Sequence, residues 1–87
     1  MYILGDIGNS ETKIFLVNSS GKILKRINFL SKKINNEILN SKFNQIGKNF
    51  NKIKKILFCS VVPNTFNLIK KNLSKKTKIK CYEIKSL

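Results

Sequence analysis

The residues of this chain that could carry out chemistry are concentrated in one short polar stretch near the N-terminus. Asp6 stands near the end of an apolar run and is followed by Gly8, Asn9 and Ser10. A carboxylate among apolar residues is unfavourable unless a cation or hydrogen-bond donors compensate its charge. Successive N–H groups of a turn form a concave anion site, and Mg²⁺ needs only one or two carboxylates when phosphate and water supply its other ligands. This stretch is therefore a candidate phosphate-binding loop in which Asp6 would hold the metal.

The residues around this stretch extend the candidate site. Gly8 allows the backbone to approach a ligand closely, Ser10 and Thr12 carry hydroxyl donors, and Lys13 adds a positive charge. Ordinary turns use the same residue types, so a plain hairpin with Asp6 as a local acceptor also explains the stretch. The candidate phosphate-binding residues are Asp6, Ile7, Gly8, Asn9, Ser10, Glu11, Thr12 and Lys13, and Asp6 is the candidate metal ligand through phosphate or water.

Two strands are needed to position such a loop. Residues 2–7 and 12–17 form short, largely apolar runs on either side of it, which predicts an antiparallel hairpin across a Gly-Asn turn. A cluster of turn residues at 18–21 then precedes a third run at 22–29. The first third of the chain is therefore predicted to be an antiparallel meander.

The rest of the chain alternates between helical and extended patterns. Apolar residues recur at steps of three and four over residues 34–53, which predicts one amphipathic helix. In residues 55–62 both the even-numbered and the odd-numbered positions carry apolar side chains, as in a strand buried on both faces, and Pro63 ends the run. A second helix is predicted at 64–75 and a last strand at 78–84.

Within these elements the large apolar side chains are expected to form the core. Val61 and Val62 are assigned to it, and Cys59, in the same apolar run, is expected to be a buried free thiol. The phenylalanines assigned to the core by their spacing are Phe43, Phe50, Phe58 and Phe66.

The connections predict how the elements assemble. Hairpins and right-handed crossovers give an α/β fold with a mixed five-stranded sheet in the order 3-2-1-4-5 and two helices on one face. The first and fourth strands, however, have the apolar pattern of strands covered on both faces. An apolar face without cover is an interaction or aggregation surface. We therefore expect the isolated chain to aggregate, to fold only in part, or to bury this face against a partner.

Composition limits the class of protein further. The net charge is +14, which invites a nucleic-acid interpretation, but 17 of the 18 basic residues are Lys and only Arg26 offers a bidentate guanidinium. Lys, Asn and Ile all have AT-rich codons, so an AT-rich genome is an alternative explanation for much of this charge. Two Cys and no His leave too few ligands for a zinc site. No apolar run approaches the ~20 residues of a membrane span, and no secretory signal is recognisable, so a cytoplasmic protein is expected.

The order of elements and two motifs resemble a known family. An Asp-x-Gly-Asn-Ser strand end, a hairpin return, a third strand and then α-β-α-β resemble the opening half-domain of the actin, hexokinase and Hsp70 superfamily, which has a ribonuclease H-like core. Asp6-Ile7-Gly8-Asn9-Ser10 is similar to the first phosphate motif of type III pantothenate kinases, and Lys13 stands where many members have Lys. Ser60-Val61-Val62-Pro63 resembles their Ser-Val-Val-Pro signature.

This resemblance implies a function. It implies transfer of the ATP γ-phosphoryl group to the pantothenate hydroxyl in the first step of coenzyme A biosynthesis, with Mg²⁺, a monovalent cation (K⁺ or NH₄⁺) and a homodimer when full length. Asp6 would hold the metal-phosphate, and Gly8, Asn9, Ser10 and Lys13 the ATP phosphates. The Gly-Ala-Asp-Arg motif that carries the family's general base has no counterpart in the 87 residues.

Residues 1–87 are therefore expected to be a single, incomplete N-terminal phosphate-binding lobe that lacks the second lobe and is inactive alone. Two alternatives remain at this stage. One is a nonenzymatic remnant or regulatory half-domain. The other is a small basic nucleic-acid-binding protein, whose binding would weaken steeply as salt rises.

Overall fold

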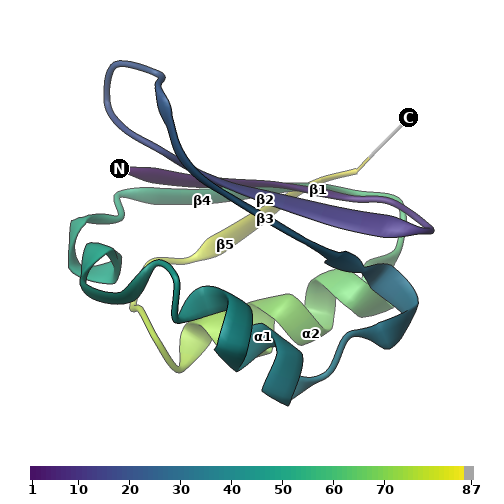
Figure 1. Cartoon of the computed structure of the whole chain (residues 1–87). Coiled ribbons are helices and arrows are strands. Elements are labelled where there is room, and N and C mark those ends of the chain that lie inside the picture. Colours follow the sequence, from purple (N-terminus) through teal and green to yellow (C-terminus); the bar gives the residue numbers. More distant parts are fainter. Residues whose placement is uncertain (86–87) are drawn as a thin grey trace.

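The computed structural model describes residues 1–85 and has an α/β fold built on one sheet (Figure 1). The strands are β1 (Tyr2–Ile7), β2 (Glu11–Val17), β3 (Ile23–Leu30), β4 (Lys55–Ser60) and β5 (Cys81–Lys85). Their order is β3-β2-β1-β4-β5; β2 is antiparallel to both β1 and β3, and β4 is parallel to both β1 and β5. The predicted fold class and strand order are confirmed.

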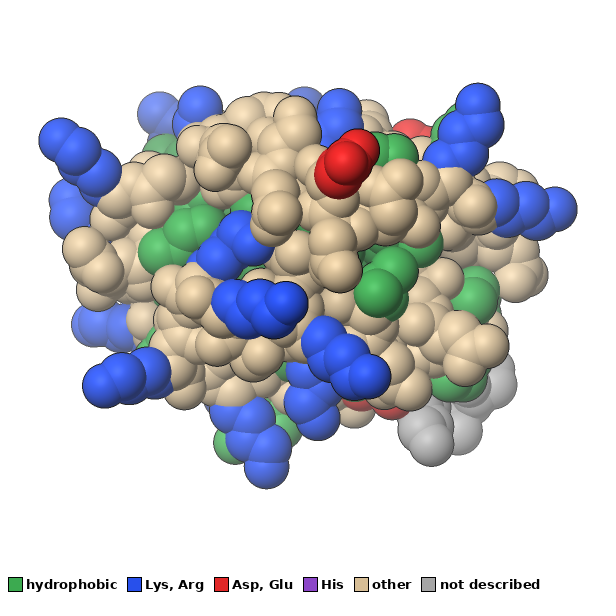
Figure 2. Space-filling model, turned by 90° about the horizontal axis from the view of Figure 1, so that it is seen from below, with side chains coloured by type: hydrophobic (Ala, Val, Ile, Leu, Met, Phe, Trp, Pro, Cys, Tyr) green, Lys and Arg blue, Asp and Glu red, His purple; other side chains and the backbone are tan. Residues whose placement is uncertain are grey.

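The helical elements lie together on one side of this sheet, as Figure 1 shows. They are α1 (Asn36–Phe43) and α2 (Pro63–Ser74), with two short 3₁₀ helices, η1 (Ser31–Lys33) and η2 (Gly47–Lys52). Seen from this helical side, basic side chains (Lys and Arg) are spread over the surface and its rim rather than gathered in a single patch (Figure 2). No helix of the described chain is both long enough and apolar enough to span a membrane.

The prediction of one helix over residues 34–53 is wrong. α1 ends at Phe43, and the segment that follows turns before η2 begins at Gly47. Gly47 has a φ of 51°, a left-handed conformation that a continuous right-handed helix cannot contain. The apolar spacing continues across the break because both pieces pack on the same core, so periodicity alone cannot detect the interruption.

Two residues assigned to the core lie on the surface. Cys59 is exposed, whereas Cys81 is the buried thiol. Val61 is 48% exposed, because β4 ends at Ser60 and Val61 lies in the turn before α2. A strand that is apolar at both parities does not reveal which of its faces the helices cover, and Cys59 points to the uncovered one.

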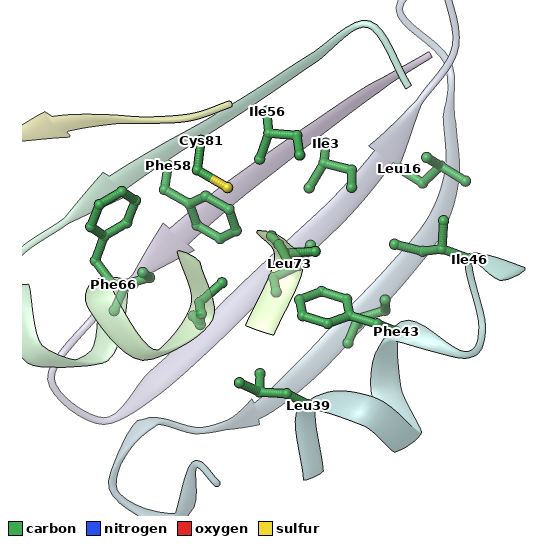
Figure 3. Close-up of a cluster of buried hydrophobic side chains, with 14 of the residues drawn as sticks. Ile3, Leu16, Leu39, Phe43, Ile46, Ile56, Phe58, Phe66, Leu73 and Cys81 are labelled. Atoms are coloured by element: carbon green, nitrogen blue, oxygen red, sulfur yellow. The ribbon is translucent and has the colours of Figure 1, made fainter. Parts of the chain in front are cut away.

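The core fills the space between the sheet and the helices. Gly5 is essential to its packing, because a Cβ there would stand 2.1 Å from both Cδ1 and Cε1 of the Phe58 ring. That ring is fully buried and meets Phe66 edge-on, with 6.1 Å between ring centroids. The labelled core residues in Figure 3 are Ile3, Leu16, Leu39, Phe43, Ile46, Ile56, Phe58, Phe66, Leu73 and Cys81.

The opposite face of the sheet has no helix over it in the described chain (Figure 1). We call it the open face and define it by Leu4, Phe15, Leu57, Tyr82 and Ile84. Leu4 lies between Phe15 and Leu57 in the strand pairing, and Leu57 is paired with Tyr82. Leu4 is 39%, Tyr82 50% and Ile84 51% exposed. The expected apolar face without helical cover is therefore present, while its effect on solubility stays a prediction.

Candidate functional site

The predicted phosphate loop is the turn between β1 and β2, residues 8–11. Ile7 pairs with Thr12 at its base, and the Gly8 N–H donates to the Glu11 carbonyl across it, at 3.0 Å. A Cβ on Gly8 would lie 3.1 Å from that same carbonyl oxygen, which is tighter than ordinary contact. A side chain at position 8 would therefore require the turn to widen by a few tenths of an ångström, and Asn9 and Ser10 stand exposed at its tip.

A residue that the sequence analysis did not identify holds this loop from beneath. The Ser31 hydroxyl donates to the Gly8 carbonyl at 2.7 Å, and the Ser31 N–H donates to the Ser10 carbonyl at 3.0 Å. The Thr12 hydroxyl lies 2.8 Å from the Ser31 hydroxyl. Ser31 lies beside the loop because Leu30, the last residue of β3, pairs with Glu11; the predicted meander had no defined register and so did not reveal this contact.

Two of the three charged candidates, Asp6 and Lys13, face each other across strands β1 and β2. Both are exposed, and Asp6 also neighbours Cys59 on β4. The argument that Asp6 is a desolvated charge in an apolar strand is therefore wrong, because its carboxylate reaches water on the open side of the sheet. A hydrated carboxylate beside a lysine and a loop tip remains free to accept a metal–phosphate from solution.

The remaining candidates divide between surface and interior. Ile7 and Thr12 are fully buried, so they support the loop from the core side, whereas Glu11 is exposed at the start of β2. Among the described residues, no group of three or more His, Cys, Asp or Glu could hold a metal ion. A cation here would consequently take its other ligands from phosphate and water, as Mg²⁺ commonly does.

The Ser-Val-Val-Pro segment lies next to the loop's base. The Val61 N–H donates to the Ile7 carbonyl at 3.1 Å, and the Val62 N–H donates to the buried Ser60 hydroxyl at 3.1 Å. Pro63 occupies the first turn of α2, where its missing N–H leaves no donor unsatisfied. The two sequence motifs are thus brought together at the carboxyl ends of β1 and β4.

The strand order and the loop define the class of this chain. A mixed sheet ordered β3-β2-β1-β4-β5, with an Asp-x-Gly-Asn-Ser turn after its central strand, is a ribonuclease H-like half-domain. The family model of type III pantothenate kinase matches residues 2–87. The chain is also 52% identical, over all 87 residues, to the type III pantothenate kinase of Pelagibacter ubique (strain HTCC1062). The chain belongs to the type III pantothenate kinase family, and it spans 35% of the length of that relative.

Proposed function

We propose that this chain is the lobe of a type III pantothenate kinase that holds the ATP phosphates while the γ-phosphoryl group passes to the pantothenate hydroxyl. The observation that carries this proposal is the loop of residues 8–11. Its exposed tip lies beside the Asp6 carboxylate and the Lys13 ammonium group of the flanking strands, at one end of the central strand of the sheet. Family membership over residues 2–87 supports the substrate class.

Each loop residue has a role in this proposal. Asp6 binds Mg²⁺ through phosphate or water, and Lys13 offsets the phosphate charge. Asn9 and Ser10 offer backbone N–H groups and polar side chains at the tip, where turn amides favour an anion. Gly8 keeps the turn narrow, while Ile7, Glu11 and Thr12 act through the shape of the loop rather than through ligand contact.

The rest of the activity requires residues beyond this lobe. Proton removal from the pantothenate hydroxyl needs a general base, which we assign to the part of the family sequence that this chain does not span. We further propose ATP with Mg²⁺ and a monovalent cation (K⁺ or NH₄⁺) as cofactors, a cytoplasmic location, and a homodimer for the full-length enzyme. The single lobe is expected to show no pantothenate phosphorylation alone.

Titration of the chain with Mg·ATP tests the proposal directly. Amide ¹H–¹⁵N spectra are expected to show shifts concentrated at Gly8, Asn9 and Ser10, and the shifts should disappear when the metal is chelated. Asp6→Asn should weaken binding strongly. Glu37→Gln is the matched control, because it removes one exposed acid from α1 instead. Shifts centred elsewhere, or equal effects of the two substitutions, would refute the assignment.

The net charge of +14 favours a second candidate, a nucleic-acid-binding protein. Binding driven by phosphate contacts loses affinity as a steep power of the salt concentration. Mg·ATP binding at a single loop should depend on salt much less, because few charges are neutralised. Retained binding of single- or double-stranded nucleic acid at physiological salt, with no response of the loop amides to Mg·ATP, would favour this alternative.

A further inference from the structure

Ser31 contacts the loop at two carbonyl groups that lie on either side of Asn9. Its hydroxyl donates to the Gly8 carbonyl at 2.7 Å, and its N–H donates to the Ser10 carbonyl at 3.0 Å. The carbonyl of one residue and the N–H of the next belong to one planar trans peptide and point in opposite directions. Holding the Gly8 carbonyl inward therefore turns the Asn9 N–H outward, toward the exposed tip.

The hydroxyl groups beneath the loop form a chain with a defined direction. A serine hydroxyl has a single proton, and that of Ser31 is used on the Gly8 carbonyl. The Thr12 hydroxyl, 2.8 Å away, must therefore be the donor to the Ser31 oxygen. Thr12 is fully buried and Ser31 is 4% exposed, so water does not readily replace either partner. Hydrogen bonds in such a chain strengthen one another in a low dielectric.

We propose that Ser31 is a positioning residue, which aims the Asn9 N–H at the ATP phosphates by holding the Gly8 carbonyl. This inference rests on the proposed function, and Ser31 itself touches no ligand. Thr12 acts one step further away: it supports the Ser31 hydroxyl but does not contact the Gly8 carbonyl. Loss of the Ser31 hydroxyl should therefore disturb the loop more than loss of the Thr12 hydroxyl.

The test compares Ser31→Ala, Ser31→Thr and Thr12→Val in the full chain. Mg·ATP and Mg-tripolyphosphate are titrated calorimetrically, and the Asn9 N–H and Gly8 carbonyl shifts are followed by NMR. Ser31→Ala should weaken binding of both ligands about tenfold, the factor that corresponds to 1.4 kcal/mol. Ser31→Thr should restore affinity, and Thr12→Val should weaken it by less than Ser31→Ala does. Ser74→Ala is the matched control, because the Ser74 hydroxyl also donates to a carbonyl, that of Lys71, far from the loop.

The outcomes separate this inference from the function it rests on. In the ligand-free chain, Ser31→Ala should shift the Gly8 carbonyl and Asn9 N–H signals, and Ser31→Thr should restore them, whether or not Mg·ATP binds. Unchanged signals, or Ser31→Ala matching Ser74→Ala, would overturn the positioning role. Equal loss of affinity in Thr12→Val and Ser31→Ala would also overturn it, because the Ser31 hydroxyl would then have no effect beyond that of the hydroxyl that supports it. If Ser31→Ala does not fold, Ser31→Cys replaces it, and undiminished affinity there would contradict the proposal.

Discussion

The contact between Gly5 and Phe58 predicts that Gly5→Ala is severely destabilising. The added methyl would lie 2.1 Å from two ring carbons, whereas ordinary van der Waals contact begins near 3.4 Å. The ring is fully buried and is backed by Phe66 of α2, so the added methyl would push the ring against that helix. Overpacking of a core usually costs about 1–3 kcal/mol, and this clash belongs at or above the upper end. A chain of this size has a free energy of unfolding of only ~5–10 kcal/mol.

Urea denaturation of dilute protein, followed by far-ultraviolet circular dichroism, measures this loss. Gly47→Ala is the control, because nothing lies within 4 Å of its Cβ and only the φ of 51° opposes the substitution. That conformational strain is worth ~1–2 kcal/mol. Phe58→Leu, which trims the ring, should partly rescue Gly5→Ala but should not rescue Gly47→Ala. If Gly5→Ala is no worse than Gly47→Ala, or if Phe58→Leu gives no rescue, the steric argument fails.

Three further outcomes are expected. Burial raises the pKa of the Cys81 thiol from 9.0 to about 11, so the folded state keeps this proton at pH values where the unfolded state loses it. The free energy of unfolding should therefore be unaffected by this thiol below pH 9 and should fall as pH rises from 9 toward 11. In Cys81→Ala, the urea midpoint should fall less over the same pH range. On the open face, Tyr82→Lys should reduce self-association, measured by sedimentation, and the binding of a hydrophobic dye, measured by fluorescence. Val61→Lys, at a comparably exposed site in the β4–α2 turn, should change neither, and equal effects of the two substitutions would show that the open face is not the associating surface. Asp6→Asn should leave Tm nearly unchanged, because the carboxylate is exposed, while strongly lowering turnover in the complete enzyme. A lowered Tm with full turnover would favour a plain hairpin.

The order of the strands could be predicted because it depends on the short connections between successive elements. Short turns dictate the antiparallel neighbours of β2, and right-handed crossovers place β4 beside β1. The position of Asp6 at the end of the first strand followed from the same reasoning. Its surroundings did not, because β1 is apolar at both parities and the pattern does not say which face the helices cover.

Other features depend on contacts between distant residues. Gly5 shows no signal in the sequence, since its role depends on the ring of Phe58, which lies beside it only after β1 and β4 pair. Ser31 follows β3 without any motif around it, and its two bonds to the loop arise from the strand register. The break after α1 depends on a left-handed Gly47, which a uniform helical periodicity conceals.

The hydrogen bonds at the base of the loop have a consequence for motion. The Ile7 carbonyl is bonded to the β4–α2 turn, the Gly8 N–H closes the loop on itself, and the Gly8 carbonyl is held by Ser31. With these groups engaged, the backbone has no free hinge at the point where β1 enters the loop. The loop is therefore expected to bind a nucleotide without changing its backbone conformation, as a fixed extension of the sheet. Because Asn9 and Ser10 stand exposed at the tip, binding of the proposed ATP phosphates would then depend on a preformed surface rather than on the swing of a flexible flap.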